Sequence, residues 1–164
     1  AVAAENPRHV ILRTAWVYSP FGKNFVKTMF RLAGERDVVR VVCDQFGNPT
    51  SALDLADGIL HVASALVASP DTSPRGVFHI AGSGEASWAN VAEKVMAVCE
   101  QRGQRRAEVR RVVTNEFPTK ARRPADSRLN CAKLLQAYGW SAPQWESSLA
   151  EVVGELADGA RRSD

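Results

Sequence analysis

The residues best suited to chemistry in this chain are the side chains that follow one predicted strand and the basic side chains of a late loop. The apolar run 9–12 is typical of a buried parallel strand, and the segment 13–18, Arg-Thr-Ala-Trp-Val-Tyr, follows it directly. Open α/β sheets bind ligands beyond the carboxyl ends of their strands, so 13–18 is a candidate binding segment. Four basic residues form the second candidate: Lys120, Arg122, Arg123 and Arg128. Their positive charge within one loop favours an anion site.

Alternating strands and helices must position these segments. Apolar residues at helical spacing predict helices near 25–33, 54–67, 88–99, 132–138 and 145–156. Apolar or β-branched runs predict further strands near 38–43, 76–82 and 109–113. Asp54 and Ser87 are predicted N-caps, and Gly139 is a predicted C-cap. This alternation favours an α/β fold with a parallel or mixed sheet.

Size and composition indicate an ordinary globular domain. The 164 residues are 45% hydrophobic and 24% charged, and their net charge of +3 does not favour nucleic acid as a partner. No stretch approaches the roughly 20 apolar residues that cross a membrane, and no signal peptide is recognisable. The three cysteines are far apart and odd in number, which argues against a disulfide framework or a zinc site and indicates a reducing cytoplasm.

Four segments, taken in order, resemble one enzyme family. The segment 13–18 is followed by 22–28, Gly-Lys-Asn-Phe-Val-Lys-Thr, and then by 44–50, Asp-Gln-Phe-Gly-Asn-Pro-Thr. A late loop over 118–130 contains Arg-Pro and then Ser and Leu. Together these segments resemble the dTDP-4-dehydrorhamnose reductases of the extended short-chain dehydrogenase/reductase superfamily. The resemblance extends over nearly the whole chain.

The resemblance implies an α/β fold that is the C-terminal part of an extended short-chain dehydrogenase/reductase Rossmann fold, with its small substrate-binding subdomain. The remaining Rossmann strands and helices would be 1–20 and 54–103, and the subdomain would be 21–53 and 104–158. The N-terminal cofactor-binding half would be absent. We also expect a cut within a longer protein, because the first residues resemble the end of a helix.

The resemblance assigns substrate-binding roles in the first half of the chain. Trp16 would pack against a hexose ring beside the nicotinamide, since an indole offers a flat apolar face and one N–H group; a core aromatic is the alternative. Asn24 and Phe25 would lie near the nucleotide end of the substrate, with a plain helix cap as the alternative for Asn24. Gln45 would bind the edge of thymine, because its amide is both donor and acceptor.

The late loop would bind the diphosphate of the same substrate. Arg123 is the best candidate, because a planar guanidinium binds phosphate oxygens in a bidentate manner, and Ser127 and Arg128 would support it. Some relatives form dimers through a divalent metal held by glutamates. Leu53 stands near that position here and cannot bind a hard cation, so a metal-bridged dimer is not expected. A homodimer of another kind is an expectation.

The catalytic residues of the superfamily are not found in this sequence. Its proton donor is a tyrosine four positions before a lysine, whereas Tyr18 and Tyr138 have Gly22 and Ala142 at that distance. The turn Gly82-Ser83-Gly84 lacks the third glycine of a dinucleotide-binding turn and is interpreted as an ordinary loop. NADPH, or NADH, would therefore bind mainly to a part of the enzyme that this chain does not contain.

The complete enzyme, by resemblance, would reduce dTDP-4-dehydro-L-rhamnose to dTDP-L-rhamnose for cell-wall or surface polysaccharide. The chain alone would be inactive, and its partner would be a dTDP-sugar rather than nucleic acid or a membrane. One alternative is a non-catalytic nucleotide-sugar-binding or regulatory module of the same fold. A Tyr-x-x-x-Lys upstream of Ala1 would favour the enzyme over this module. Another nucleotide-sugar epimerase or dehydratase is the third possibility, and the 44–50 loop favours the reductase over it.

Overall fold

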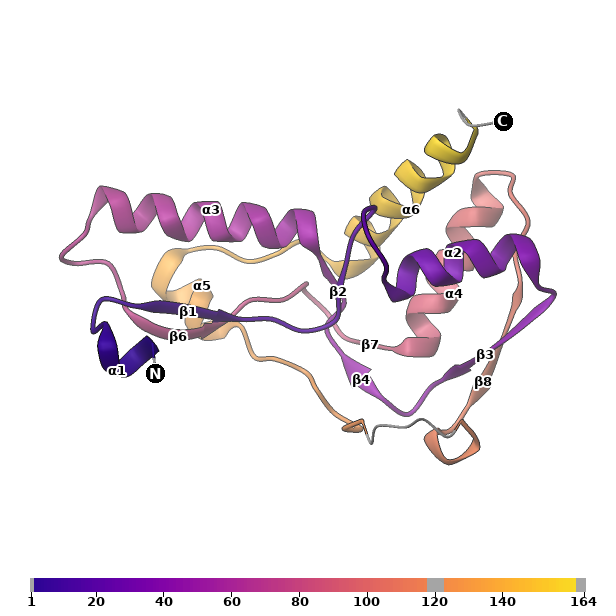
Figure 1. Ribbon diagram of the computed structural model, residues 1–164, viewed down its shortest axis with the longest axis horizontal. Coiled ribbons are helices and arrows are strands. Elements are labelled where there is room, and N and C mark those ends of the chain that lie inside the picture. Colours follow the sequence, from indigo (N-terminus) through magenta and orange to yellow (C-terminus); the bar gives the residue numbers. More distant parts are fainter. Residues whose placement is uncertain (1, 118–122, 162–164) are drawn as a thin grey trace.

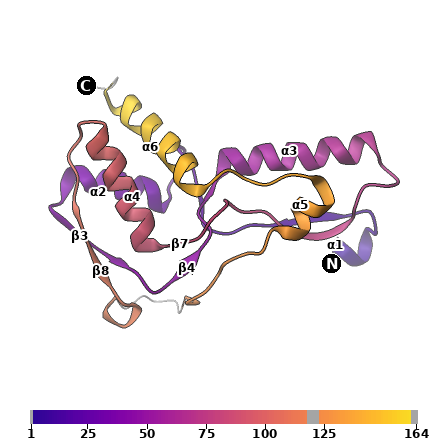
Figure 2. The same ribbon diagram turned by 180° about the vertical axis from the view of Figure 1, so that it is seen from behind.

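The computed structural model describes residues 2–117 and 123–161, which form an elongated molecule with two lobes (Figure 1). Each lobe has its own hydrophobic cluster, and short strand pairs lie where the lobes join. The view from behind shows the same division (Figure 2). Within the described part of the chain, no helix has the length and apolarity that crossing a lipid bilayer requires.

The first lobe is built on two parallel strands. β1 (Val10–Arg13) pairs with β6 (Gly76–His79) in register, with Val10 opposite Gly76. The helices α3 (Ala52–Ala68) and α5 (Ala132–Tyr138) pack against this pair, and the short α1 (Val2–Glu5) precedes it. The buried core of this lobe consists of Val62, Phe78, Ile80, Leu134 and Tyr138.

The second lobe surrounds the helix α4 (Trp88–Gln101). It also contains α2 (Phe25–Glu35), α6 (Trp145–Arg161) and two parallel strands, β3 (Val38–Val42) and β8 (Glu108–Val112). Seven residues of α4 are buried: Ala89, Val91, Ala92, Val95, Met96, Val98 and Cys99. Most of these side chains are small or β-branched, so α2 and α6 approach α4 closely and the three helices share one core.

Short strands lie at the junction of the lobes. β2 (Val17–Tyr18) pairs in parallel with β5 (Thr50–Ser51), and β4 (Phe46–Gly47) pairs antiparallel with β7 (Ala86–Ser87). A 3-10 turn, η1 (Thr114–Glu116), follows β8. The predicted binding segments 13–18 and 44–50 therefore meet at this junction.

The helix ends show which local predictions hold. Ser87 caps α4 in a reciprocal capping box with Asn90, and Gly139 ends α5 in the left-handed conformation, with φ of 67°, as predicted. The predicted cap at Asp54 is wrong. Ser51 is the N-cap of α3, and its hydroxyl accepts the Leu53 N–H at 3.2 Å, so the helix begins at Ala52.

The packing of two helices differs from the expected division of the chain. That division placed 1–20 and 54–103 in the Rossmann part, and 21–53 and 104–158 in the substrate-binding subdomain. α4 was expected with the Rossmann elements, but it shares a core with α2 and α6. α5 was expected in the subdomain, but Leu134 and Tyr138 pack with the strands of the first lobe. In both cases the position of the apolar face decides the packing partner, and the order of elements along the chain does not.

Candidate functional site

Three aromatic rings form a row at the junction of the lobes. Trp16 and Trp88 stack with ring centroids 3.6 Å apart and planes inclined by 8°. Phe25 lies 4.7 Å from Trp88, with an inclination of 59°. The rings come from three places, since Trp16 precedes β2, Phe25 begins α2 and Trp88 begins α4. Such contacts contribute about 0.5–1.5 kcal/mol beyond area burial, so the row forms a stable wall.

Trp16 is enclosed by its neighbours. Its backbone has φ of 52°, in the left-handed region that residues other than glycine rarely adopt. A Cβ at Gly47 would lie 2.5 Å from Nε1 and 2.7 Å from Cδ2 of Trp16, so the Gly47 main chain lies against the indole. Trp88 stacks on the ring and Gly47 packs against it, so only part of the indole is left for the predicted contact with a hexose. Trp16 can reach a ligand only through the part of the ring that these two residues leave uncovered.

Ser127 connects this row to the late loop. The indole N–H of Trp16 donates to Ser127 Oγ at 2.9 Å. The Ser127 hydroxyl and its backbone N–H both donate to the carbonyl oxygen of Phe46, each at 2.9 Å. Two predicted site residues that are 111 positions apart in the sequence are thus in direct contact.

Two cavities share the wall that Phe25 and Trp88 form. The small cavity has a volume of about 170 Å³ and is lined by both of these residues together with Trp16 and Asn24. The large groove has a volume of about 820 Å³, and Gln45 and Arg123 are among its lining residues. The structure therefore brings together all six predicted substrate-binding residues: Trp16, Asn24, Phe25, Gln45, Arg123 and Ser127.

The large groove combines apolar and basic side chains. Its apolar lining comes mainly from α2 and β3: Met29, Leu32, Val38, Val39, Val41 and Val42. Three guanidinium groups also line it, those of Arg36, Arg40 and Arg123, and Arg40 donates to the carbonyl oxygen of Glu116 at 3.1 Å. A groove of this kind suits a ligand with a flat apolar ring and an anionic tail.

Of the other basic residues of the late loop, the structure describes only Arg128, which is not among the lining residues of this groove. Lys120 and Arg122 lie outside the described residues. Arg128 donates to Asp126 and to Glu85, each at 2.7 Å, and its hydrogen bonds lower the pKa of Asp126 to about 2. The charge of Arg128 is therefore balanced by two carboxylates within the protein, and Arg123 is the described member of the group that faces the groove.

Gln45 has a fixed orientation at the large groove. The residue is 6% exposed, and its Nε2 donates to Thr114 Oγ1 at 3.1 Å. Asp44 accepts the backbone N–H of Thr114 at 3.0 Å and its hydroxyl at 2.7 Å. These hydrogen bonds, the backbone one first, lower the pKa of Asp44 below its usual value. The Thr114 hydroxyl thus links the two side chains, because it donates to Asp44 and accepts from Gln45.

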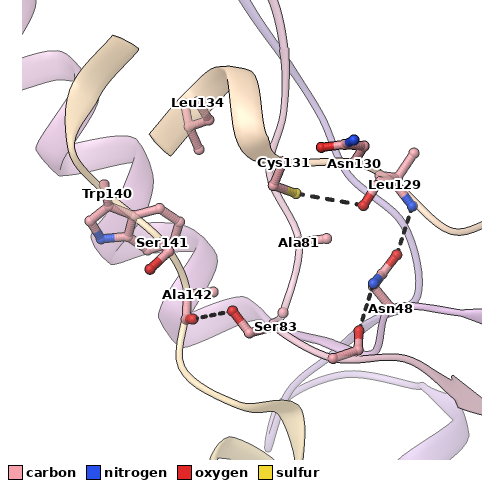
Figure 3. A pocket seen from close by; sticks show the side chains of 12 residues that line it. Asn48, Ala81, Ser83, Leu129, Asn130, Cys131, Leu134, Trp140, Ser141 and Ala142 are labelled. Atoms are coloured by element: carbon pink, nitrogen blue, oxygen red, sulfur yellow. Dashed lines mark hydrogen bonds between the residues drawn. The ribbon is translucent and has the colours of Figure 1, made fainter. Parts of the chain in front are cut away.

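Asn48 joins the 44–50 loop to two other loops (Figure 3). Its Nδ2 donates to the carbonyl oxygen of Gly84 at 2.6 Å, and its Oδ1 accepts the backbone N–H of Leu129 at 2.7 Å. Nearby, the Ser83 hydroxyl donates to the carbonyl oxygen of Ala142 at 2.6 Å. These residues line a third cavity of about 270 Å³, and their polar groups hold the surrounding loops together.

Asn24 is the N-cap of α2, and its contact with the nucleotide end of a substrate stays a prediction. Its Oδ1 accepts the backbone N–H of Lys27 at 3.0 Å, and its Nδ2 donates to the carbonyl oxygen of Ser19 at 2.8 Å. The residue also lines the small cavity, but these internal hydrogen bonds already engage both ends of its amide.

The described residues do not fit a dinucleotide turn or a metal site. A Cβ at Gly82 would overlap the carbonyl oxygen of Pro49, so packing against the 44–50 loop explains this glycine without a bound phosphate. The Tyr18 hydroxyl donates to the carbonyl oxygen of Trp145 at 3.4 Å, and burial, followed by the charge of Asp54, raises the pKa of Tyr18 well above its usual value. Within the described ranges, no group of three His, Cys, Asp or Glu side chains could hold a metal ion, and Leu53 is 46% exposed.

Sequence reasoning missed three residues that line the cavities. Trp88 was assigned only to the apolar face of a helix, and its place directly after the Ser87 cap was the available signal for a role at the site. Arg36 is the C-cap of α2 and Arg40 lies within β3, and neither was singled out. Only the packing of α2 beside β3 shows that both guanidinium groups belong to the groove.

Comparison with known proteins identifies close relatives. Residues 1–158 match the family described as the RmlD substrate binding domain. A dTDP-4-dehydrorhamnose reductase of Sinorhizobium fredii is 47% identical over 156 residues, which cover 95% of this chain and 53% of the relative. The protein of the same name from Escherichia coli strain K12 is 39% identical and covers 91% of this chain and 50% of its own length. The chain thus spans about half the length of the curated relatives it matches.

Solved structures agree with this relationship. A dTDP-4-dehydrorhamnose reductase from Clostridium acetobutylicum matches with a TM-score of 0.83 and 36% identity, over 94% of this chain and 51% of that one. The Bacillus anthracis protein of that name, in complex with NADP, has a TM-score of 0.75 and 35% identity, over 89% of this chain and 48% of that one. The fold is therefore that of the C-terminal half of the Rossmann-like extended short-chain dehydrogenase/reductases. This chain belongs to the RmlD substrate-binding domain family.

Proposed function

We propose that this chain binds a dTDP-hexose and forms the substrate-binding half of a reductase that converts dTDP-4-dehydro-L-rhamnose to dTDP-L-rhamnose. The names of the curated relatives support the reaction. The NADP in the Bacillus anthracis structure supports a nicotinamide cofactor, NADPH or NADH, for the whole enzyme. The observation that carries the proposal is the meeting of a small cavity and a large basic groove at Phe25 and Trp88.

In this proposal the nucleotide lies in the large groove and the hexose in the small cavity. Arg123 binds the diphosphate, because its planar guanidinium can engage two phosphate oxygens at once. Gln45 binds the edge of thymine, since its amide keeps donor and acceptor capacity beyond the hydrogen bond to Thr114. The valine side chains of β3 bury the flat face of the base.

The chain contributes binding and orientation to this reaction. A nicotinamide cofactor, when bound to the complete enzyme, supplies the hydride. Neither tyrosine of the chain is followed four positions later by a lysine, and the Gly82 turn is explained by internal packing. We therefore propose that the hydride and the proton donor both come from outside this chain, and that the chain alone does not oxidise NADPH.

We further propose that the second lobe is the substrate-binding subdomain and that the first lobe contributes Rossmann elements. β1 pairs with β6 along one edge, and within the described residues its other edge has no strand partner. An open strand edge favours pairing with another strand, so a homodimer of the isolated chain is part of the proposal. The reducing cytoplasmic location rests on the three cysteines, none of which forms a disulfide. A monodisperse monomer in sedimentation velocity would contradict the dimer.

Isothermal titration calorimetry of the purified chain tests the nucleotide site. We expect saturable binding of dTDP and dTDP-L-rhamnose, and about tenfold weaker binding of dTMP, which lacks one phosphate for Arg123. Absorbance at the NADPH band should stay constant when the chain is mixed with NADPH and dTDP-4-dehydro-L-rhamnose. No binding of dTDP, or equal affinities for dTDP and dTMP, would contradict the assignment of the groove.

A further inference from the structure

We propose that Thr114 is a positioning residue for the large groove: together with Asp44, its hydroxyl holds the Gln45 amide in one orientation and so fixes the order of donor and acceptor that a ligand meets. This inference rests on the proposed function, because it concerns the base end of a dTDP-sugar. Gln45 lines the groove, whereas Asp44 and Thr114 act through its amide.

The strand pairing places Asp44 and Thr114 side by side. β3 and β8 run in parallel, with Val42 opposite Val112 (Figure 1). The Cys43 N–H continues the ladder, because it donates to the carbonyl oxygen of Val112 at 2.9 Å. Just beyond, the backbone N–H of Thr114 donates to both carboxylate oxygens of Asp44, each at 3.0 Å. The register of the two strands therefore sets this contact.

The direction of the hydrogen bonds follows from the groups involved. Hydrogen bonds from Thr114 lower the pKa of Asp44 below its usual value, so the carboxylate is ionised at neutral pH and can only accept. The Thr114 hydroxyl donates its single proton to Asp44 Oδ1 at 2.7 Å. It can then only accept from Gln45, whose Nε2 lies 3.1 Å away. The reverse orientation of the amide would set two oxygens with no proton between them against each other.

The rest of the Gln45 amide is available to a ligand. Among the described residues, no buried side-chain nitrogen or oxygen lacks a hydrogen-bond partner, and Oε1 of Gln45 accepts from none of them. Oε1 is therefore not sealed within the protein, and the residue lines the groove. Nε2 also has a second N–H group beside Oε1. The groove thus presents one acceptor and one donor in a fixed order.

This order is what distinguishes two similar bases. Thymine has the acceptor O4 beside the donor N3–H, whereas cytosine has a donating 4-amino group beside the acceptor N3. A fixed amide edge matches only one of these two orders, but an amide that is free to turn by 180° can match either. Loss of the Thr114 hydroxyl should therefore reduce the discrimination between the bases while Gln45 itself is unchanged.

A matched pair of nucleotides measures this discrimination. dTDP and 5-methyl-dCDP share the methyl group and the diphosphate, and they differ only at N3 and at the 4-position of the base. Calorimetry on the full chain should give at least about tenfold tighter binding of dTDP, because the other base leaves polar groups of the amide unpaired. Thr114→Val replaces the hydroxyl by a methyl group, and the ratio of the two affinities should fall to about threefold or less.

Two substitutions separate orientation from folding. Thr114→Ser keeps the hydroxyl and should keep the ratio of the unchanged chain. Thr72→Val makes the same chemical change at an exposed residue between α3 and β6, and it should also leave the ratio unchanged. If Thr114→Val does not fold, NMR of the unchanged chain decides, with the Gln45 amide assigned by its loss in Gln45→Met. Addition of dTDP should shift one Nε2 proton and leave the proton bonded to Thr114 in place.

The possible results are distinguishable. Binding of dTDP and 5-methyl-dCDP with equal affinities would overturn this inference and leave the nucleotide site intact. A ratio that is unchanged in Thr114→Val, an equal fall in Thr114→Ser, or a shift of both Nε2 protons would also overturn it. Absence of dTDP binding to the unchanged chain would overturn the proposed function as well. A ratio that falls in Thr114→Val and is retained in Thr114→Ser and Thr72→Val is the supporting result.

Discussion

Removal of the Asn48 side chain should measurably weaken the junction between the lobes. Asn48→Ala removes the hydrogen bond from Nδ2 to Gly84 and the hydrogen bond from the Leu129 N–H to Oδ1. The hydrogen bond from the Leu129 N–H is partly buried, whereas the one to the Gly84 carbonyl oxygen is exposed. In the variant, water can therefore satisfy the Gly84 carbonyl more easily than the Leu129 N–H. With about 1 kcal/mol for each hydrogen bond, and slightly more for the buried one, we expect a loss of about 2 kcal/mol in the free energy of unfolding.

Urea unfolding followed by tryptophan fluorescence measures this loss, and thermal unfolding should show a Tm lower by about 4–8 °C. Asn115→Ala is the matched control, because Asn115 is exposed on η1, and its change should stay within about 0.5 kcal/mol. Affinity for dTDP should also fall in Asn48→Ala, since the Leu129 contact anchors the late loop that carries Arg123 and Ser127. Equal unfolding free energies for the two alanine variants would refute the reasoning that Asn48 joins the three loops.

Three further outcomes are expected. Arg123→Gln should weaken dTDP binding by about ten- to a hundredfold in calorimetry, since hydrogen bonds to charged groups contribute about 1.5–3 kcal/mol. Arg106→Gln, the control, breaks only an exposed ion pair with Glu100 and should leave the affinity for dTDP unchanged. Equal effects of the two substitutions would contradict the assignment of Arg123 to the diphosphate. The pKa of Asp126 is lowered from 3.8 to about 2, so the unfolded chain binds more protons between these values, and this contribution to stability should disappear as the pH falls from about 4 to about 2. Across that pH range, urea unfolding of Asp126→Asn should give a free energy of unfolding that depends less steeply on pH than that of the unchanged chain. Identical slopes for the two proteins would exclude the pairing of Asp126 with Arg128 as the cause of the pH dependence. EDTA should change neither the Tm nor the sedimentation coefficient, because the described residues offer no metal cluster; a shift in either would show that a metal is bound.

The sequence predicted the elements of this fold better than their packing. Ser87 and Gly139 were found as caps because capping depends on residues only a few positions apart. Asp54 was predicted as the cap in place of Ser51, because the helical spacing does not distinguish a helix start two or three residues earlier. The grouping of α4 with the second lobe depends on distant partners, which periodicity does not report.

The candidate site shows the same limit. The resemblance identified residues that the structure brings around two adjoining cavities, including Gln45 and Arg123. It could not show that Trp88 covers part of Trp16, since this stacking joins segments that are far apart in the sequence. For the same reason Trp88 was interpreted as an ordinary core residue, although both cavities include it in their linings.

The close fit of Gly47 against Trp16 restricts how these two positions can change in evolution. Any side chain at position 47 would collide with the indole, so a mutation there is tolerated only in a sequence that has already exchanged Trp16 for a smaller residue. Loss of the indole in turn removes the ring on which Trp88 stacks and the N–H group that donates to the Ser127 hydroxyl. The two positions should therefore diverge as a pair, with position 16 changing first, and descendants that keep tryptophan at 16 should keep glycine at 47.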